Sequence, residues 1–263
     1  MQTIHSKIDA RGVLTLSMNR PEVHNAFDST MIRELTEALR TAADNDEVRL
    51  LLITGVGSCF SAGADINWMR SQVEASQQEN ERDAMQLADL MRTLNYLPKP
   101  TIARINGAAF GGGLGLIAAC DITIAVDDAL FGLTEARLGL APAVISPYVF
   151  RRIGERNARR YFLTAERFDS RQAQTIGLIQ QIVQADQLDE SVETAIGELL
   201  KGGPFAVATC KQLVFAVAGH DEESQKTMDE YTSGLIAGLR IMDEGQEGLA
   251  AFLEKRKPAW LQE

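Results

Sequence analysis

The sequence has little of the chemistry that holds metals or disulfide bonds. Three cysteines and three histidines are scattered through 263 residues, with no CxxC pair and no spacing typical of a metal site. A sparse, odd number of cysteines is typical of reduced thiols in a reducing compartment. We therefore expect no metal and no disulfide framework, and we expect a cytoplasmic protein.

The chain also lacks a net positive charge and any long apolar run. Its formal net charge is −10 and its pI is about 4.9, which disfavours nucleic acid and anionic membrane surfaces as main partners. No uncharged apolar run reaches the roughly 20 residues of a membrane span. The beginning of the chain shows no apolar segment typical of a signal peptide. A small anionic ligand stays compatible with this charge, because it needs only a few local cations.

What the sequence does have is a large apolar fraction in alternating strand-like and helix-like segments. Hydrophobic residues make up 45% of the chain, enough for the core of one large α/β domain or two small ones. A repeated β-then-α order indicates α/β architecture. The expected strands are residues 3–8, 13–18, 48–54, 101–105, 121–126, 130–132 and 180–183. The expected helices are residues 29–43, 72–95, 114–120, 145–153, 157–164, 170–175, 188–200, 204–217, 222–239 and 243–254.

Some boundaries can be predicted in more detail. Asp28 or Ser29 can cap the first helix. The polar residues 71–83 are typical of a solvated or mobile segment. A Gly-Gly-Pro stretch separates a β-containing core, residues 1–201, from a helical region, residues 202–263.

The most unusual stretch is NGAAFGGGLG at residues 106–115. A strand candidate runs into it and an apolar helix candidate runs out of it. Three consecutive glycines at a helix N-terminus leave bare N–H donors, which can hold an anion or an oxygen that becomes an anion during a reaction. The alternative is a tight turn that needs glycine for steric reasons alone.

Two further stretches suggest a site. The loop GVGSCFSAGADIN at residues 55–67 has small side chains, which let a ligand approach the backbone, although a plain surface turn is the alternative. Glu135 is a single carboxylate among apolar and glycine-rich neighbours. Burial there would raise its pKa and suit it to proton transfer near neutrality. The alternatives are an ion pair with Arg137 and a solvated loop acid.

Together these motifs resemble the crotonase (enoyl-CoA hydratase/isomerase) superfamily. The likeness covers essentially the whole chain, with the motifs in the family's order. The motifs that carry it are FSAGADI at 60–66, NGAAFGGG at 106–113, ACDI at 119–122, FGLTE at 131–135, EGL at 247–249 and EKR at 254–256. The resemblance implies a crotonase-type α/β spiral of ββα repeats with a C-terminal helical trimerisation region. It also implies a homotrimer or a homohexamer.

The resemblance assigns roles to individual residues. The backbone amides of Ala64 and Gly112 would form an oxyanion hole for the thioester carbonyl, where each donor can supply roughly 3–4 kcal/mol. Glu135 would be the catalytic acid–base. Besides the two amides, the residues that would line the passage for substrate and CoA are Asp65, Ile66, Asn67 and either Lys255 or Lys257. No separate cofactor is implied, because coenzyme A is part of the substrate.

One position departs from the family pattern. The family's hydratases commonly hold one water with two glutamates, of which the later matches Glu135 and the earlier falls on Gly115. Glu135 then makes both proton transfers, or another residue or water replaces the missing acid, or the reaction is not simple hydration. We expect that Gly115 supplies space for a branched acyl chain, so that Gly115→Ala is tolerated much better than a change at Glu135.

The stretch GLTEARLGLAPAVISPY at residues 132–148 is similar to bacterial methylglutaconyl-CoA hydratases and their isoprenoid-degrading relatives. This likeness predicts a hydratase of a branched, carboxylated enoyl-CoA in leucine or isoprenoid catabolism. The candidate partners of the extra carboxylate are Arg70, Arg137, Asn67 and Ser146. The alternatives are a Δ3,Δ2-enoyl-CoA isomerase that uses a single glutamate and a non-catalytic acyl-CoA-binding protein.

Overall fold

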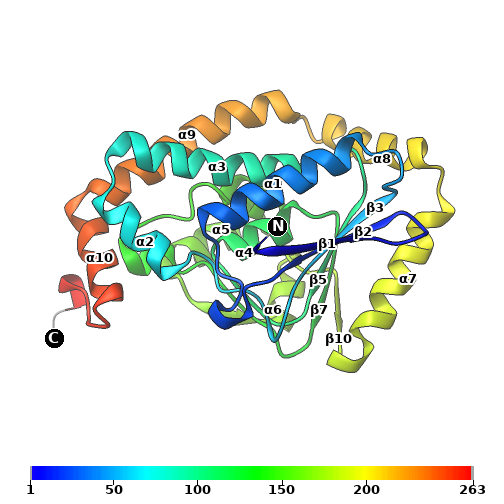
Figure 1. The fold of residues 1–263 in the computed structure, drawn as a ribbon. Coiled ribbons are helices and arrows are strands. Elements are labelled where there is room, and N and C mark those ends of the chain that lie inside the picture. The colour runs from blue at the N-terminus through cyan, green and yellow to red at the C-terminus, as the bar shows by residue number, and fades with distance from the viewer. Residues whose placement is uncertain (1, 262–263) are drawn as a thin grey trace.

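The computed structural model describes residues 2–261, which form two sheets with helices packed around them (Figure 1). The six-stranded sheet has the order β1-β2-β3-β5-β7-β10, and the four-stranded sheet has the order β4-β6-β8-β9. The strands are β1 Ile4–Ile8, β2 Val13–Met18, β3 Leu50–Gly55, β4 Cys59–Ser61, β5 Thr101–Ile105, β6 Ala108–Phe110, β7 Ile122–Val126, β8 Leu130–Gly132, β9 Arg167–Asp169 and β10 Gln181–Val183. The α-helices are α1 Ser29–Asp44, α2 Ile66–Glu74, α3 Gln77–Asn95, α4 Gly112–Ala119, α5 Ser146–Thr164, α6 Ser170–Thr175, α7 Leu188–Lys201, α8 Pro204–Val217, α9 Glu222–Ile241 and α10 Asp243–Leu253. The 3₁₀ helices are η1 Pro21–Val23, η2 Glu135–Leu138, η3 Ala185–Gln187 and η4 Ala259–Leu261.

The middle of the chain winds as repeated ββα turns. Strands β3, β5 and β7 are parallel neighbours in the six-stranded sheet. The strands that follow each of them, β4, β6 and β8, are parallel neighbours in the four-stranded sheet. A helix follows each strand pair: α2 and α3 after β4, α4 after β6, and α5 after β8 and η2. The carboxyl ends of β4, β6 and β8 therefore meet at one edge, as the expected α/β spiral requires.

Apolar strands hold the six-stranded sheet in the interior. Every residue of β3 is buried, which is typical of parallel strands that are covered on both faces. The register places Leu52 beside Ile102 and Ile102 beside Ile122, so a row of branched side chains crosses the sheet. Contacts of this kind stabilise a sheet through burial more than through intrinsic strand preference.

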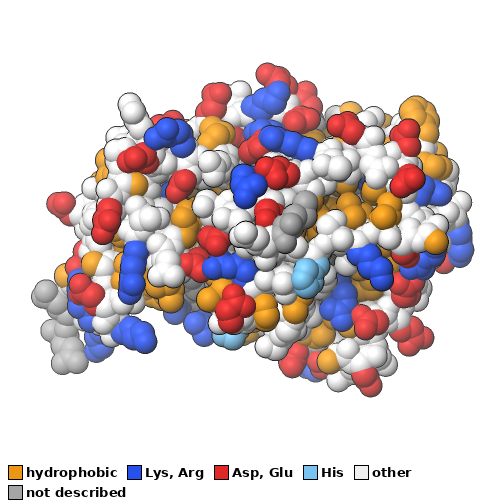
Figure 2. All heavy atoms as spheres, viewed as in Figure 1, with side chains coloured by type: hydrophobic (Ala, Val, Ile, Leu, Met, Phe, Trp, Pro, Cys, Tyr) orange, Lys and Arg blue, Asp and Glu red, His pale blue; other side chains and the backbone are white. Residues whose placement is uncertain are grey.

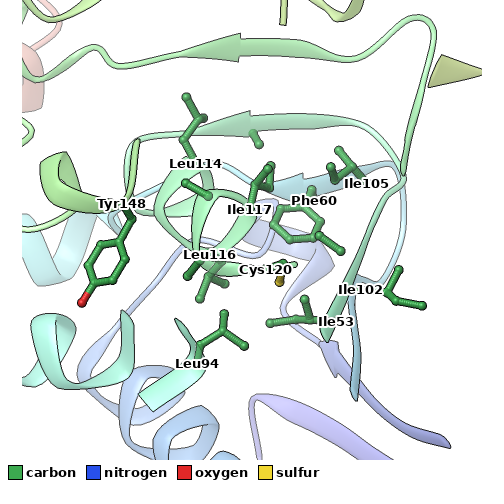
Figure 3. Packing of buried hydrophobic residues seen from close by; sticks show 14 of the residues in the cluster. Ile53, Phe60, Leu94, Ile102, Ile105, Leu114, Leu116, Ile117, Cys120 and Tyr148 are labelled. Carbon is green, nitrogen blue, oxygen red and sulfur yellow. The ribbon is translucent and has the colours of Figure 1, made fainter. Parts of the chain in front are cut away.

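Helix α4 lies at the centre of the hydrophobic core (Figure 3). Its sequence GGLGLIAA carries no charge, and every residue after the first glycine is buried. In Figure 3, Ile117 lies toward Phe60 of β4, and Leu116 lies toward Leu94 of α3. A helix that is apolar on all sides is stable only when protein surrounds it. The core therefore fixes the position of α4, including its N-terminal glycines.

The segment predicted as a single helix over residues 72–95 forms two helices, so this prediction is wrong. The carboxylate of Asp65 caps α2 by accepting hydrogen bonds from the amides of Asn67 (2.8 Å) and Trp68 (3.3 Å). Ser76 then starts α3 in a capping box with Glu79. Two caps a short distance apart satisfy the amides of two helix N-termini, which one continuous helix would not need.

The same region is less solvated than its composition indicates. Residues 71–83 were expected to be solvated or mobile, yet Gln72 and Asn80 are buried. The amide of Asn80 donates to the carbonyl of Gln72 at 3.0 Å, across the junction of α2 and α3. Part of the polar sequence thus faces the interior, where it forms specific contacts.

Other elements follow the sequence closely. Asp28 caps α1, because its carboxylate accepts a hydrogen bond from the amide of Met31 at 2.8 Å. The helices predicted over residues 145–153 and 157–164 are the two halves of α5, which is kinked at Gly154. Strands β4, β6 and β9 were not predicted. Each has three residues, too few for a periodic pattern.

The C-terminal helices divide into a packed group and an exposed one. Helix α9 packs along α3, and α10 contacts α2 and η2 (Figure 1). Helix α8 has no buried residue, and its large exposed apolar side chains are Phe205, Leu213, Val214 and Val217. Acidic and basic side chains are interspersed over the face drawn in Figure 2. Among the described residues, no helix is long and apolar enough to cross a membrane.

Candidate active site

Three loops that leave the four-stranded sheet form one side of a cavity of about 300 Å³. They follow β4, β6 and β8, whose carboxyl ends meet because the three strands are parallel neighbours. We call this side the loop wall, made of Gly63, Ala64, Gly111, Gly112 and Glu135. Residues from three distant parts of the sequence thus line one space, which is where ligands bind in many sheets of this kind.

Two glycines allow these loops to approach each other closely. Gly63 has φ 89° and Gly111 has φ 48°, values in the left-handed region that favours glycine. A Cβ atom at Gly63 would lie 3.1 Å from the carbonyl oxygen of Phe110, and one at Gly111 would lie 3.2 Å from Glu135 Oε1. Glycine at these positions therefore makes room for the neighbouring backbone and for the carboxylate.

The loop wall presents two backbone amides without partners. Within the described part of the chain, no hydrogen bond joins the amide of Ala64 or of Gly112 to another residue. The adjacent amide of Asp65 is occupied, because it donates to the carbonyl of Phe27 at 2.8 Å. Gly112 begins α4, so its amide also lies at the partially positive end of a helix. The two groups can stabilise an oxygen that gains negative charge.

The side chain of Glu135 meets the cavity with an unpaired oxygen. Its Oε2 is buried and has no hydrogen-bond partner. Burial raises the pKa of the Glu135 carboxyl from 4.5 to about 7, and Arg137 does not contribute to this shift. Glu135 is the only carboxylate among the described residues that line the cavity. A carboxyl with this pKa can accept or donate a proton near neutral pH.

A second part of the lining, which we call the helical wall, is made of Trp68, Met69 and Gln72 of α2 with Ile236 and Arg240 of α9. Leu249 and Phe252 of α10 add to it. The chain's own C-terminal helices α9 and α10 therefore line its cavity. Sequence reasoning did not find Gln72 or Arg240, because nothing near either residue in the sequence marks it as part of a site.

The predicted site residues separate into two groups. Ala64, Gly112 and Glu135 are brought together as predicted. The carboxylate of Asp65 points to Arg20 (2.9 Å) in addition to capping α2. The predicted passage residues that do not line this cavity are Asp65, Ile66, Asn67 and Lys255. Their contact with CoA stays a prediction, and Ile66, 51% exposed, is open to solvent.

Only one of the candidate partners of a substrate carboxylate lines the cavity. Of the four proposed from the sequence, Arg137 lines the cavity, whereas Arg70, Asn67 and Ser146 do not. The hydroxyl of Ser146 donates to the carbonyl of Ala143 at 2.6 Å. No group of three or more His, Cys, Asp or Glu side chains that could hold a metal occurs among residues 2–261.

Gly115 has a different role from the one predicted. It is buried one turn into α4 and does not line the cavity. A Cβ atom there would overlap Ile145 Cγ2 and lie 2.9 Å from Met91 Cε. The prediction that Gly115 leaves space for an acyl chain is wrong, because side chains of α3 and the loop before α5 already fill that space.

Comparisons with known proteins identify the family of this chain. The model of the enoyl-CoA hydratase/isomerase family matches residues 9–263. An enoyl-CoA hydratase of Shewanella pealeana with a solved structure is 45% identical, covers 98% of this chain and 96% of its own, and has a TM-score of 0.80. One from Mycobacterium avium is 34% identical over 99% of both chains, with a TM-score of 0.86. An enoyl-CoA hydratase of Alternaria alternata is 30% identical over 96% of this chain and 86% of its own. The resemblance and the crotonase-type fold are thereby confirmed, and the chain is an enzyme of the enoyl-CoA hydratase/isomerase family.

Proposed function

We propose that the enzyme adds water across the double bond of a branched, carboxylated enoyl-CoA such as methylglutaconyl-CoA. The observation that carries this proposal is the buried, unpaired Oε2 of Glu135 in the same cavity lining as the free amides of Ala64 and Gly112. This arrangement provides one proton-transfer group and two donors for an oxyanion, which are the requirements for addition next to a thioester.

The reaction follows from these groups. The thioester carbonyl accepts hydrogen bonds from both amides, and a water lies between Glu135 and the β-carbon. Glu135 takes a proton from the water as its oxygen attacks, and the electron pair of the double bond moves into an enolate whose oxygen the two amides stabilise. Protonated Glu135 then gives a proton to the α-carbon. Because Gly115 replaces the family's other glutamate, we assign both transfers to Glu135, whose pKa of about 7 suits both directions.

The charges around the cavity favour an acyl group that carries an anion. Arg137, Arg167 and Arg240 line it, against the single carboxylate of Glu135. The protein as a whole has a net charge of −10, so this excess of cations is local. A carboxylated substrate is consistent with such a cavity. A role in leucine or isoprenoid catabolism follows from that substrate.

The proposal includes assembly into a homotrimer or homohexamer. The apolar side chains on α8 support it, since Phe205 and Val217 are largely exposed in the single chain. Exposed apolar groups that cluster on one element commonly mark a subunit interface. Lys255, exposed near the end of the chain, is the proposed contact for the CoA phosphates.

A panel of linear and branched enoyl-CoA thioesters tests the function, with products identified by mass. Hydration adds the mass of one water and consumes the conjugated enoyl thioester. If a β,γ-enoyl-CoA is instead converted to the conjugated form without a change of mass, the enzyme is the isomerase that a single glutamate allows. Acyl-CoA binding without turnover of any panel member would indicate the non-catalytic alternative.

A further inference from the structure

Arg240 is a buried cation in the helical wall. Only 7% of its surface is exposed, and its Nε has no hydrogen-bond partner. No carboxylate of residues 2–261 forms an ion pair with it, and Asp83 is the only acid that acts on its pKa. Burial lowers that pKa to about 10, so the side chain stays charged at neutral pH. A buried charge without a partner is strongly unfavourable. We therefore expect an anionic group of a ligand to pair with this guanidinium.

Gln72 offers a second unpaired donor in the same wall. It is 3% exposed, and its Nε2 has no hydrogen-bond partner. Both Gln72 and Arg240 line the cavity. Buried polar groups are nearly always hydrogen-bonded in folded proteins. Two such exceptions in one wall therefore indicate that the wall is built to bind an acceptor.

Asn80 holds these two residues in a common framework. Its side-chain oxygen accepts a hydrogen bond from Arg240 Nη1 at 3.3 Å, and its side-chain nitrogen donates to the carbonyl of Gln72 at 3.0 Å. Asn80 is itself fully buried. Bracing α9 against α3 in this way uses Nη1 of Arg240 and leaves Nε unpaired. A structural brace alone does not account for the remaining donor.

The environment of Arg240 differs from that of the other cations that line the cavity. Trp68, Met69 and Ile236 give its wall an apolar surface, in which a charge-assisted hydrogen bond is stronger than in water. Arg137 and Arg167 are exposed instead, and Arg167 lies over the ring of Phe110 at 5.1 Å. Water screens charges at exposed positions. Arg240 is therefore the cation best placed to discriminate between an anionic and a neutral acyl group.

We infer that Gln72 and Arg240 bind a carboxylate at the far end of the acyl chain. The helical wall thereby selects acyl-CoA substrates that end in an anion. The inference rests on the proposed acyl-CoA site and identifies the residues that recognise the end of the acyl group. The carboxylate accepts hydrogen bonds from the guanidinium of Arg240 and from the side-chain amide of Gln72. Both unpaired donors, Arg240 Nε and Gln72 Nε2, then have a partner. Neither residue was among the candidates proposed from the sequence.

Binding of unreactive thioesters tests the inference separately from hydration. Succinyl-, glutaryl- and adipyl-CoA lack the double bond, and each is compared by calorimetry with the same thioester whose terminal carboxylate is an amide. We expect the wild-type protein to bind at least one carboxylate about ten- to a hundred-fold more tightly than its amide, the range for a hydrogen bond to a charged group. If no member of the series is preferred over its amide, the inference is overturned.

Variants then assign the preference to residues. Arg240→Met replaces the charged side chain with an unbranched apolar one. We expect it to bring the ratio of carboxylate to amide affinity close to one. Arg137→Met removes an exposed cation that lines the same cavity, and we expect it to lower the ratio much less than Arg240→Met does. A ratio that falls in the Arg137 variant and persists in the Arg240 variant would overturn the inference.

Gln72→Leu provides a second test that removes a donor without changing the charge. We expect a several-fold fall in the ratio while the affinity for the amide is nearly unchanged, a pattern that general unfolding does not produce. An unchanged ratio would remove Gln72 from the inference. This result would overturn the inference of a two-residue site even if the Arg240→Met variant failed to fold. A normal preference in a protein that hydrates no enoyl-CoA would refute the proposed function and leave this inference in place.

Discussion

The two walls of the cavity each contain an ionisable side chain with a buried, unpaired atom, but burial shifts the two pKa values in opposite directions. In the loop wall, burial raises the pKa of Glu135 to about 7. In the helical wall, it lowers the pKa of Arg240 to about 10. Burial disfavours the charged form in both cases. Near neutral pH the carboxyl can therefore exchange its proton, whereas the guanidinium keeps its charge.

The walls also differ in how the chain builds them. The loop wall lies at the ends of strands β4, β6 and β8, so the parallel register fixes its parts. The helical wall depends on how α2, α3 and α9 pack, through contacts such as those of Asn80. We therefore expect changes in the loop wall to affect turnover, and changes in the helical wall to affect which acyl group binds.

The largest expected effect comes from Glu135→Gln, which keeps the shape of the side chain but cannot accept a proton. Because one group carries both transfers, we expect kcat to fall by roughly 10³-fold, within the range of positioned acid–base catalysis. Acyl-CoA affinity should be nearly unchanged. Steady-state turnover and calorimetry on the same variant measure both quantities. Retention of more than about a tenth of wild-type turnover would exclude Glu135 as the base. If turnover, acyl-CoA affinity and stability all fell together, the role of Glu135 would be structural.

The next effect isolates one backbone donor. A Cβ at Gly112 would lie 2.8 Å from the ring of Phe27, so any substitution disturbs that contact. Gly112→Ala is the matched control, since it adds the Cβ but keeps the N–H. Gly112→Pro adds the Cβ and removes the N–H, at a first helical position that tolerates proline. We expect kcat of the proline variant to be about 10²-fold below that of the alanine variant. Equal turnover in the two variants would argue against Gly112 as an oxyanion donor.

A smaller effect marks where the loop wall ends along α4. Gly115→Ala should destabilise the protein by about 1–3 kcal/mol, because overpacking of Ile145 and Met91 strains the core. Gly197→Ala in α7 is the control, since a Cβ there meets nothing within 4 Å. That variant should be more stable than the wild type by about 0.5–1 kcal/mol. Denaturant unfolding of the two variants measures both values. Equal stabilities would show that the space beside Gly115 is open after all.

The smallest effect is the pH dependence of stability that Glu135 causes. Its carboxyl titrates near 4.5 in the unfolded chain and near 7 in the folded protein. Between these values the folded state binds more protons, so ionisation of Glu135 lowers stability as pH rises. Glu135→Gln lacks this titration. We expect the stability of this variant relative to the wild type to increase from pH 4.5 to about 7 and to be constant above that. A difference that does not change with pH would mean that the carboxyl is not buried in solution.

The sequence by itself marked the stretches that form the loop wall, because the physical requirements there are local, and the family resemblance assigned their roles. Backbone that approaches a ligand or turns through the left-handed region needs glycine, so Gly63 and Gly111 are visible as unusual residues in a linear reading. A single acid in an apolar stretch likewise marked Glu135. The repeated β-then-α order predicted the α/β fold, while strands of three residues and the break between α2 and α3 were missed.

Only the tertiary structure decided the rest. Gly115 looks like the glycines that precede it, yet the side chains that pack against it come from other parts of the chain, so its role is set by packing. Gln72 and Arg240 look like ordinary surface residues in a polar helical pattern. Their burial follows from the packing of α9 along α3 and of α10 against α2. Burial and the absence of a partner are properties of the folded surroundings, and these properties turn an ordinary arginine into a candidate for recognising an anion.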